Sequence, residues 1–265
     1  MKYTLTDETK QHNGITVRRI KYSDGSMGGW LEKEHNLSQD GLCKVLNEAV
    51  VYGNAWVYGN AVVSGNAQVS ESARVSGSAV VSGTARVSGN VVVYGNAEVS
   101  ENALVSENAL VFDSALVSEN ALVSENALVF GNAEVSGNAL VYGKARVSGN
   151  ARVSGSAVVS GTARVSGNEE VCSVAYVRGS AVVSLREHVK CVVGFKYPVT
   201  VTPQNVVVGC MLWSHKEALK VSYKTAAKDG ISRKELAAMR ACLLSLVKHL
   251  PRTTKVGRRL RRVVH

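Results

Sequence analysis

The chain has 265 residues and a formal net charge of +10, and 45% of its residues are hydrophobic. This composition excludes a disordered chain, and no apolar run is long enough to span a membrane. The first residues contain no apolar core of a signal peptide, and the five cysteines are scattered without a C-x-x-C pair. We therefore expect a cytoplasmic protein without membrane contact, disulfide framework or zinc site.

The positive charge is concentrated at the C-terminal end. Residues 190–265 contain sixteen Lys and Arg against three acids, which gives 16 − 3 = +13, so the preceding part of the chain carries 10 − 13 = −3. Such a distribution predicts one charged contact surface and not a uniformly basic coat.

Residues 1–44 are predicted to form an N-terminal cap. Residues 3–5 and 15–20 have the composition of short strands around an Asn-Gly turn. We expect Trp30 to pack inside the cap. His35 follows Glu34 and could suggest acid–base chemistry, but the local sequence favours an exposed turn.

Residues 45–190 follow a six-residue repeat. Every sixth residue from Val45 to Val189 is valine, and nearly every residue four places after such a valine is alanine. A fixed short period without gaps indicates a solenoid, and a six-residue unit accommodates one short strand and a tight corner. Valine and alanine are expected to point inwards, and the residues on either side of each valine outwards.

The repeat resembles the hexapeptide-repeat family, which folds as a left-handed parallel β-helix with three hexads in each coil. The sequence supports an 18-residue coil independently, because residues 101–112 recur letter for letter as residues 119–130. The expected fold is mainly β: a left-handed parallel β-helix of about eight coils with an N-terminal cap and a small C-terminal α+β module.

The lead-in to the repeats, residues 28–41, resembles a group of phage and prophage proteins that are often labelled as polymerase or polymer-forming proteins. The label is not evidence of polymerase chemistry. If the chain is phage-encoded, its location is the cytoplasm of the host cell.

Outward positions that are 18 residues apart should stack in columns, and on one face two neighbouring columns are apolar. Together these two columns predict a contiguous apolar surface, which normally marks an interface, and the family resemblance implies a homotrimer. The alternative is that the C-terminal segment folds back over this surface. On a second face, a single apolar column consists of Leu104, Leu122, Leu140 and Val158. The six residues of the predicted oligomer interface are Val92, Leu110 and Leu128 in one column and Tyr94, Phe112 and Phe130 in the next.

Residues 191–251 are predicted to form an α+β module. Residues 195–202 and 205–213 should be strands, followed by a helix over 214–228 and a second helix that ends before Pro251. Each helix begins with a capping box, Ser214 with Glu217 and Ser232 with Glu235. A basic tail covers residues 252–265.

Enzymes on left-handed β-helices use histidine as a general base or as a metal ligand, whereas residues 36–187 contain no histidine. The serines of the repeats also lack a histidine or lysine partner that could activate them. We therefore predict no catalytic residue, no cofactor and no metal. The corner asparagines should either adopt left-handed backbone or bond to their neighbours in the adjacent coils.

Two features of the C-terminal region could contact nucleic acid. The pattern from Ala226 through Gly230 to Met239 resembles a helix-turn-helix core, with Arg233, Lys234 and Arg240 on the recognition helix. The alternative is an ordinary αα-hairpin. The tail could bind phosphates without reading sequence, or it could be a solvated tail; its candidate residues are Arg258, Arg259, Arg261 and Arg262.

From these observations we expect a non-enzymatic, phage-type scaffold protein, a homotrimer that displays a basic module to a host or phage protein, for example as an anti-defence or regulatory factor. The alternative is a nucleic-acid-binding protein. An acyltransferase-like enzyme is the least favoured hypothesis.

Overall fold

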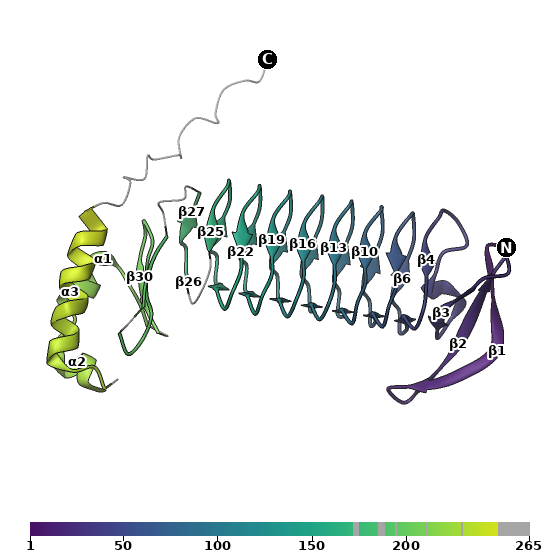
Figure 1. Ribbon diagram of the computed structural model, residues 1–265, viewed down its shortest axis with the longest axis horizontal. Helices are drawn as coiled ribbons and strands as arrows, with labels where there is room; N and C mark the ends of the chain where they lie inside the picture. Colours follow the sequence, from purple (N-terminus) through teal and green to yellow (C-terminus); the bar gives the residue numbers. More distant parts are fainter. Residues whose placement is uncertain (172–174, 185–188, 194, 210, 229, 249–265) are drawn as a thin grey trace, which may run out of the picture.

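The computed structural model describes residues 1–171, 175–184, 189–193, 195–209, 211–228 and 230–248. The chain forms an elongated prism with a strand hairpin at one end and a sheet covered by helices at the other (Figure 1). The predicted fold class, a parallel β-helix of about eight coils between a cap and an α+β module, is confirmed. In the described part of the chain, no helix is long and apolar enough to cross a membrane.

The prism has three faces, each a parallel sheet of two-residue strands that pair in register with strands 18 residues away. Face A contains β5 (Val50–Val51), β8 (Gln68–Val69), β11 (Arg86–Val87), β14 (Leu104–Val105), β17 (Leu122–Val123), β20 (Leu140–Val141), β23 (Val158–Val159) and β26 (Tyr176–Val177). Face B contains β6 (Trp56–Val57), β9 (Arg74–Val75), β12 (Val92–Val93), β15 (Leu110–Val111), β18 (Leu128–Val129), β21 (Arg146–Val147), β24 (Arg164–Val165) and β27 (Val182–Val183). Face C contains β4 (Lys44–Val45), β7 (Val62–Val63), β10 (Val80–Val81), β13 (Glu98–Val99), β16 (Leu116–Val117), β19 (Glu134–Val135), β22 (Arg152–Val153) and β25 (Glu170–Val171).

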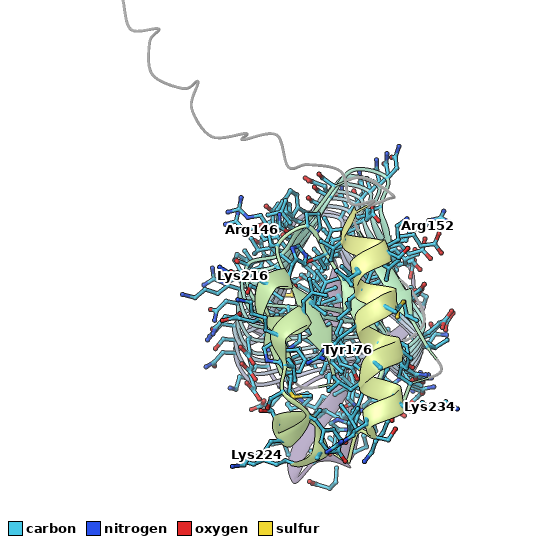
Figure 2. All side chains as sticks on the ribbon, turned by 90° about the vertical axis from the view of Figure 1, so that its left-hand side faces the viewer. Arg146, Arg152, Tyr176, Lys216, Lys224 and Lys234 are labelled. Carbon is cyan, nitrogen blue, oxygen red and sulfur yellow. The ribbon has the colours of Figure 1, made fainter. Side chains whose placement is uncertain are left out.

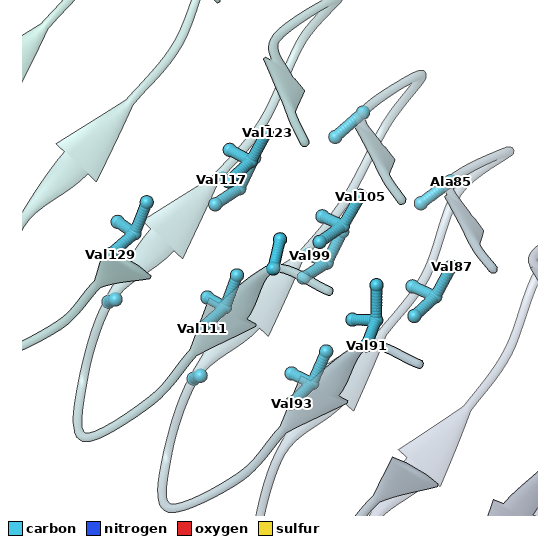
Figure 3. Packing of buried hydrophobic residues seen from close by; sticks show 14 of the residues in the cluster. Ala85, Val87, Val91, Val93, Val99, Val105, Val111, Val117, Val123 and Val129 are labelled. Atoms are coloured by element: carbon cyan, nitrogen blue, oxygen red, sulfur yellow. The ribbon is translucent and has the colours of Figure 1, made fainter. Parts of the chain in front are cut away.

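The core of the prism consists of the repeat valines on the flats, from Val45 to Val183, and the alanines at the corners, all of which are buried (Figure 3). The predicted inward pattern is therefore confirmed. At two described corners where another residue replaces the alanine, Val91 and Glu169, the side chain still lies inside. β-Branched valine suits the short strands, and the tight corner accommodates only a small side chain in most coils.

The corners contain the strained backbone of the solenoid. Most corners place a glycine at positive φ, but Glu101, Glu107, Glu119 and Glu125 have φ between 58° and 63°. The asparagines that follow these glutamates do not adopt this conformation. The side chains of Asn102, Asn108 and Asn120 bond from coil to coil instead, as in Asn102 Nδ2 to Asn120 Oδ1 at 3.2 Å. Of the two roles expected for the corner asparagines, bonding between coils is confirmed where these ladders form, and the left-handed role belongs to the preceding residue.

The N-terminal cap extends face A beyond the first coil. Its strands β1 (Tyr3–His12) and β2 (Ile15–Tyr22) form an antiparallel hairpin, and β3 (Met27–Leu31) pairs with β2 on one side and with β5 on the other. Both hairpin strands are longer than the sequence predicted. A register shift between Leu5 and Thr9 interrupts the pairing of β1 with β2. One turn of 3₁₀ helix, η1 (Glu34–Asn36), follows.

Trp30 holds the cap against the first coil, as predicted for a packing residue. Its ring is buried between the Lys10 ammonium and the Arg19 guanidinium, at 4.2 and 4.9 Å from the ring centroid. Its indole N–H donates to Glu48 Oε2 at 2.9 Å, and the same carboxylate pairs with Lys10 at 2.8 Å and Arg19 at 2.9 Å. The hydrogen bond from Lys10, together with those from Trp30 and Arg19, lowers the pKa of Glu48.

The C-terminal module seals the other end of the solenoid with a four-stranded antiparallel sheet, β28 (Lys190–Val192), β29 (Val199–Val201), β30 (Val206–Val208) and β31 (Met211–Trp213). Thr200 Oγ1 accepts a hydrogen bond from Tyr176 N at 2.9 Å, and Asn205 Nδ2 donates to Arg178 O at 3.0 Å. Two backbone groups of the last coil, Tyr176 N and Arg178 O, are therefore hydrogen-bonded.

The helices α1 (His215–Lys220), α2 (Tyr223–Lys228) and α3 (Arg233–Lys248) pack on this sheet. The prediction of one helix over 214–228 is wrong. Val221 leaves the helical conformation with ψ 123°, and Ser222 caps a new helix through its hydroxyl, which accepts from Thr225 N at 3.1 Å. The single strand predicted over 205–213 is also wrong, since the chain reverses at Gly209 with φ 56° and forms β30 and β31.

A pair of corner substitutions tests the strain in one column. Gly83→Ala should lower the free energy of unfolding by about 1–2 kcal/mol or more, because alanine disfavours positive φ and the new Cβ would lie 2.6 Å from Glu101 N. Glu101→Gly should raise stability slightly, because it removes a glutamate from a backbone position with positive φ. Glu119 occupies the same position in the next coil. Urea unfolding followed by circular dichroism measures both; equal effects of the two substitutions would contradict the assignment of strain.

The Glu48 cluster predicts a pH dependence of the cap. A carboxylate whose pKa is lowered by folding stabilises the native state above its unfolded-state pKa of about 4.3, and this contribution is lost as the pH falls through the lower folded-state pKa. Glu48→Gln should therefore reduce stability at neutral pH, and the difference from the unmodified protein should vanish under acid conditions. Unfolding curves across this range, with the distant exposed Glu98→Gln as control, measure it; a pH-independent difference would contradict the mechanism.

Candidate interaction surfaces

Face B carries the apolar surface that the sequence predicted. The rings of Tyr94, Phe112 and Phe130 form a parallel stack over three coils, with centroids 5.0 and 4.9 Å apart and interplanar angles of 3° and 2°. Val92, Leu110 and Leu128 form the neighbouring column in strict register. These six residues are called the apolar patch below. Tyr94, the first ring of the stack in chain order, keeps 39% of its surface exposed although it stacks on Phe112.

Charged residues surround the apolar patch. Along the rod, Arg74 pairs in register with Val92 before the patch, and Arg146 pairs with Leu128 after it. The corners beside the patch carry exposed acids at Glu107, Glu125 and Asp113. An apolar centre with a polar rim of both signs is the usual anatomy of a protein interface.

The other faces are less apolar. On face A the column Leu104, Leu122, Leu140 and Val158 is present in register. Three of its four outward neighbours are serines, and the fourth is Tyr142. On face C, Arg152 pairs with Glu134 at 3.3 Å, and the exposed side chains of both indicate a solvated surface. The apolar patch on face B is therefore the better interface candidate.

The described part of the C-terminal region does not cover the patch. Its sheet and helices lie at the end of the rod, beyond β26 and β27 (Figure 1). The predicted alternative, in which the C-terminal segment folds back over the patch, can concern only residues 249–265, which lie outside the described residues.

Helices α2 and α3 have the packing expected of a helix-turn-helix core. Ala226, Ile231, Leu236 and Met239 are buried together, and Gly230 makes the turn with φ 69°. Ser232 caps α3 by accepting from Glu235 N at 3.1 Å, but the Glu235 carboxylate accepts from Lys196 N instead of completing the predicted capping box. The box at Ser214 and Glu217 is confirmed. This geometry fits a helix-turn-helix and an ordinary αα-hairpin equally.

The predicted basic residues fall into three groups. Arg233 and Lys234 are exposed on the first turn of α3, where the Arg233 guanidinium lies 4.7 Å from the Tyr223 ring centroid. Arg240 is half-buried, and its Nη2 donates to the Val221 carbonyl at the end of α1. The exposed lysines of the module, among them Lys216, Lys224 and Lys234, extend outwards at the end of the rod (Figure 2). The tail candidates, Arg258, Arg259, Arg261 and Arg262, lie outside the described residues.

A hollow on face B was not predicted from the sequence. The 3₁₀ turn of the cap lies beside the first coil and forms an open hollow of about 490 Å³ with β6 and β9. The lining residues are Glu34, His35, Leu37, Ser38, Gln39, Asn54, Trp56 and Arg74. The exposed turn predicted at His35 is present, and it forms one wall. In the described residues, no group of three or more His, Cys, Asp or Glu side chains is arranged to hold a metal ion.

A comparison with protein families agrees with the repeat architecture. The family model for the YdcK beta-solenoid repeat matches residues 49–65, 55–71, 85–101 and 145–161, all within the solenoid. The chain is a repeat β-helix protein. Its similarity to YdcK-type solenoids concerns the coils alone, because the matches include neither the cap nor the C-terminal module. A search of curated proteins found no match.

The contact of Arg240 predicts a structural effect that Arg233 and Lys234 should not share. Arg240→Ala should destabilise the C-terminal module by about 1–3 kcal/mol, because it leaves the Val221 carbonyl without its charged donor. Lys234→Ala, on the exposed side of the same helix, should change stability by less than about 0.5 kcal/mol. Thermal unfolding of both variants measures the difference; an Arg240 variant as stable as the unmodified protein would contradict this role.

Proposed function

We propose that the protein is a non-enzymatic scaffold that assembles as a homotrimer through the apolar patch and displays its basic C-terminal modules to a protein partner. The observation that carries the proposal is the ladder of Tyr94, Phe112 and Phe130, whose parallel rings form a continuous apolar surface at the centre of one face. Aromatic residues at the centre of a desolvated patch are typical hot spots of protein association.

We infer that a second copy of the chain is the partner of this patch. The rim contains acids at the corners and arginines along the rod, so neighbouring copies can offset each other's charges around a threefold axis. Cyclic symmetry makes the three rods parallel and places the three C-terminal modules at the same end. Three modules on one assembly gain avidity for a repeated or oligomeric target without requiring a strong single contact.

The exposed face of α3 favours a protein over DNA as the partner of the module. Beyond its first turn, the exposed residues of α3 are Ala237, Ala238, Ala241, Leu244 and Ser245, all but the serine apolar, and Leu244 is 52% exposed. Base edges are read by side chains with hydrogen-bonding groups, such as Arg, Asn and Gln. An apolar helix face with small side chains is suited to packing against another protein surface.

Nucleic-acid binding is the second candidate, and Arg233 and Lys234 at the start of α3 favour it together with the charge of +13 in residues 190–265. An acyltransferase-like activity is the third candidate, and the absence of histidine from residues 36–187 argues against it. On the resemblance of residues 28–41, the protein is phage-type and acts in the cytoplasm of a host cell, where its partner is a host or phage protein and its role is anti-defence or regulatory.

Light scattering tests the assembly. The unmodified protein should have the mass of a trimer, and Phe112→Glu combined with Phe130→Glu should yield a monomer, because two like charges would enter the centre of the interface. Leu104→Glu with Leu122→Glu on face A is the matched control and should leave the trimer unchanged. The proposal would be contradicted if the unmodified protein were a monomer, or if the variant with both patch substitutions were still a trimer.

A mobility assay with random duplex and single-stranded DNA at two salt concentrations tests the partner class. A protein-binding module should show only weak binding, whereas neutralisation of phosphates would give tight binding that falls steeply with salt. Binding that is lost on truncation after Pro251 would assign it to the tail, and sequence-selective loss with Arg233→Ala or Lys234→Ala would assign it to α3. Either result would reverse the preference for a protein partner, which a nuclease-treated pull-down from host cells would otherwise identify.

A further inference from the structure

The hollow on face B owes its shape to the cap. Leu37 forms a parallel bridge with Val57, and Ser38 N donates to Val57 O at 2.9 Å, so residues 37–38 replace a strand one coil before β6. The buried Asn36 amide donates to the carbonyls of Gly53 at 3.2 Å and Ala55 at 2.8 Å. These bonds fix η1 beside the outward column of face B. The hollow is open to solvent, and its volume, about 490 Å³, lies within the usual range of small-molecule sites.

The floor of the hollow is a flat aromatic surface. The Trp56 ring stacks on Tyr58 with a centroid distance of 4.1 Å and an interplanar angle of 23°, and its side chain is still 42% exposed. Stacking on one ring face holds the indole in place without covering it. No apolar neighbour in the next coil extends this surface, because Arg74 occupies the register position after Trp56.

The walls offer hydrogen-bonding groups of both kinds with no net charge. Among the lining residues, Arg74 and Asn54 carry side-chain donors, and Glu34 and Asn54 carry side-chain acceptors. The charges of Arg74 and Glu34 cancel, and within the described residues neither side chain is committed to an ion pair. Gln39 has a structural role, since its amide bonds to the backbone of Lys2 and Tyr3.

We propose that this hollow binds a neutral pyranose sugar, with the C–H face of the ring on Trp56 and its hydroxyls toward Arg74, Asn54 and Glu34. A pyranose combines a flat apolar face with hydroxyls that both donate and accept, which matches a shallow aromatic floor bordered by mixed polar groups. Hydrogen bonds from hydroxyls to the guanidinium and the carboxylate are charge-assisted and fix the orientation of the ring.

Two other ligand classes fit the hollow less well. A nucleotide also stacks on aromatic rings, but the charge of its phosphate would meet the Glu34 carboxylate as well as the Arg74 guanidinium, so the lining has no net positive charge to favour it. A quaternary ammonium prefers a cage of several aromatic faces, and here the Arg74 guanidinium would repel it. Both classes therefore serve as competing probes in the test.

Saturation-transfer NMR on the full-length protein tests the proposal with the methyl pyranosides of glucose, galactose, mannose and N-acetylglucosamine, each at millimolar concentration. AMP and choline are the competing probes. We expect saturation of the ring C–H protons of at least one pyranoside and none for AMP or choline. No transfer to any of the four sugars, or stronger transfer to AMP or choline, would overturn the assignment.

Matched variants locate the signal. Trp56→Ala should weaken binding of the responding sugar by about tenfold or more, and Arg74→Gln should weaken it by a smaller factor. Arg164→Gln, in the same outward column at the other end of the rod, should leave binding unchanged. Circular dichroism and light scattering establish that each variant keeps the fold and the assembly state of the unmodified protein. Unchanged sugar binding by a folded Trp56→Ala variant would place the ligand elsewhere and refute this site.

Discussion

The structure depends on the hydrogen bonds between successive coils, which hold every residue 18 positions from its counterpart in the next coil. Leu104 N donates to Ala121 O at 2.9 Å, and Leu122 N donates to Ala139 O at the same distance. The buried valines and alanines allow this register, because each coil presents the same inner surface to the next one. A slip of one hexad would preserve the core but would redistribute every outward side chain among the three faces. The functional surfaces thus follow from the register.

The outward positions are free of packing constraints, and their composition differs strongly along the rod. On face B, an aromatic floor at Trp56 is followed by Arg74, then by the apolar patch and then by Arg146 and Arg164. The cap and the C-terminal module pair the backbone groups of the first and last coils in different ways. The cap continues a sheet and leaves a hollow over the first coil, whereas the C-terminal sheet closes the last coil with the side chains of Thr200, Gln204 and Asn205.

From the sequence we could predict the features that depend on the six-residue period alone, such as which outward residues share a column. Counting in eighteens placed Tyr94, Phe112 and Phe130 in one column, and the structure stacks their rings. The sequence could not reveal the hollow at Trp56, because the position of the 3₁₀ turn depends on the bonds of Asn36 to backbone carbonyls of another coil. The break of the predicted helix at Val221 was also hidden, since Ser222 was taken for a helix-interior residue and not for a cap. Likewise, the period did not show that Glu169 would be buried in the place of a corner alanine.

The register can be measured directly with spin labels at Ser72 and Ser180, two exposed corner positions in one column, in a protein whose native cysteines are replaced. The two positions are 108 residues apart, so six coils of 18 residues at ~4.8 Å each predict a distance of about 29 Å. Dilution with unlabelled protein suppresses distances between copies. A single narrow distribution near this value, broadened only by the label, is the expected result of dipolar spectroscopy. A distribution centred well away from it, or several populations, would contradict the 18-residue coil on which the faces, the patch and the hollow all depend.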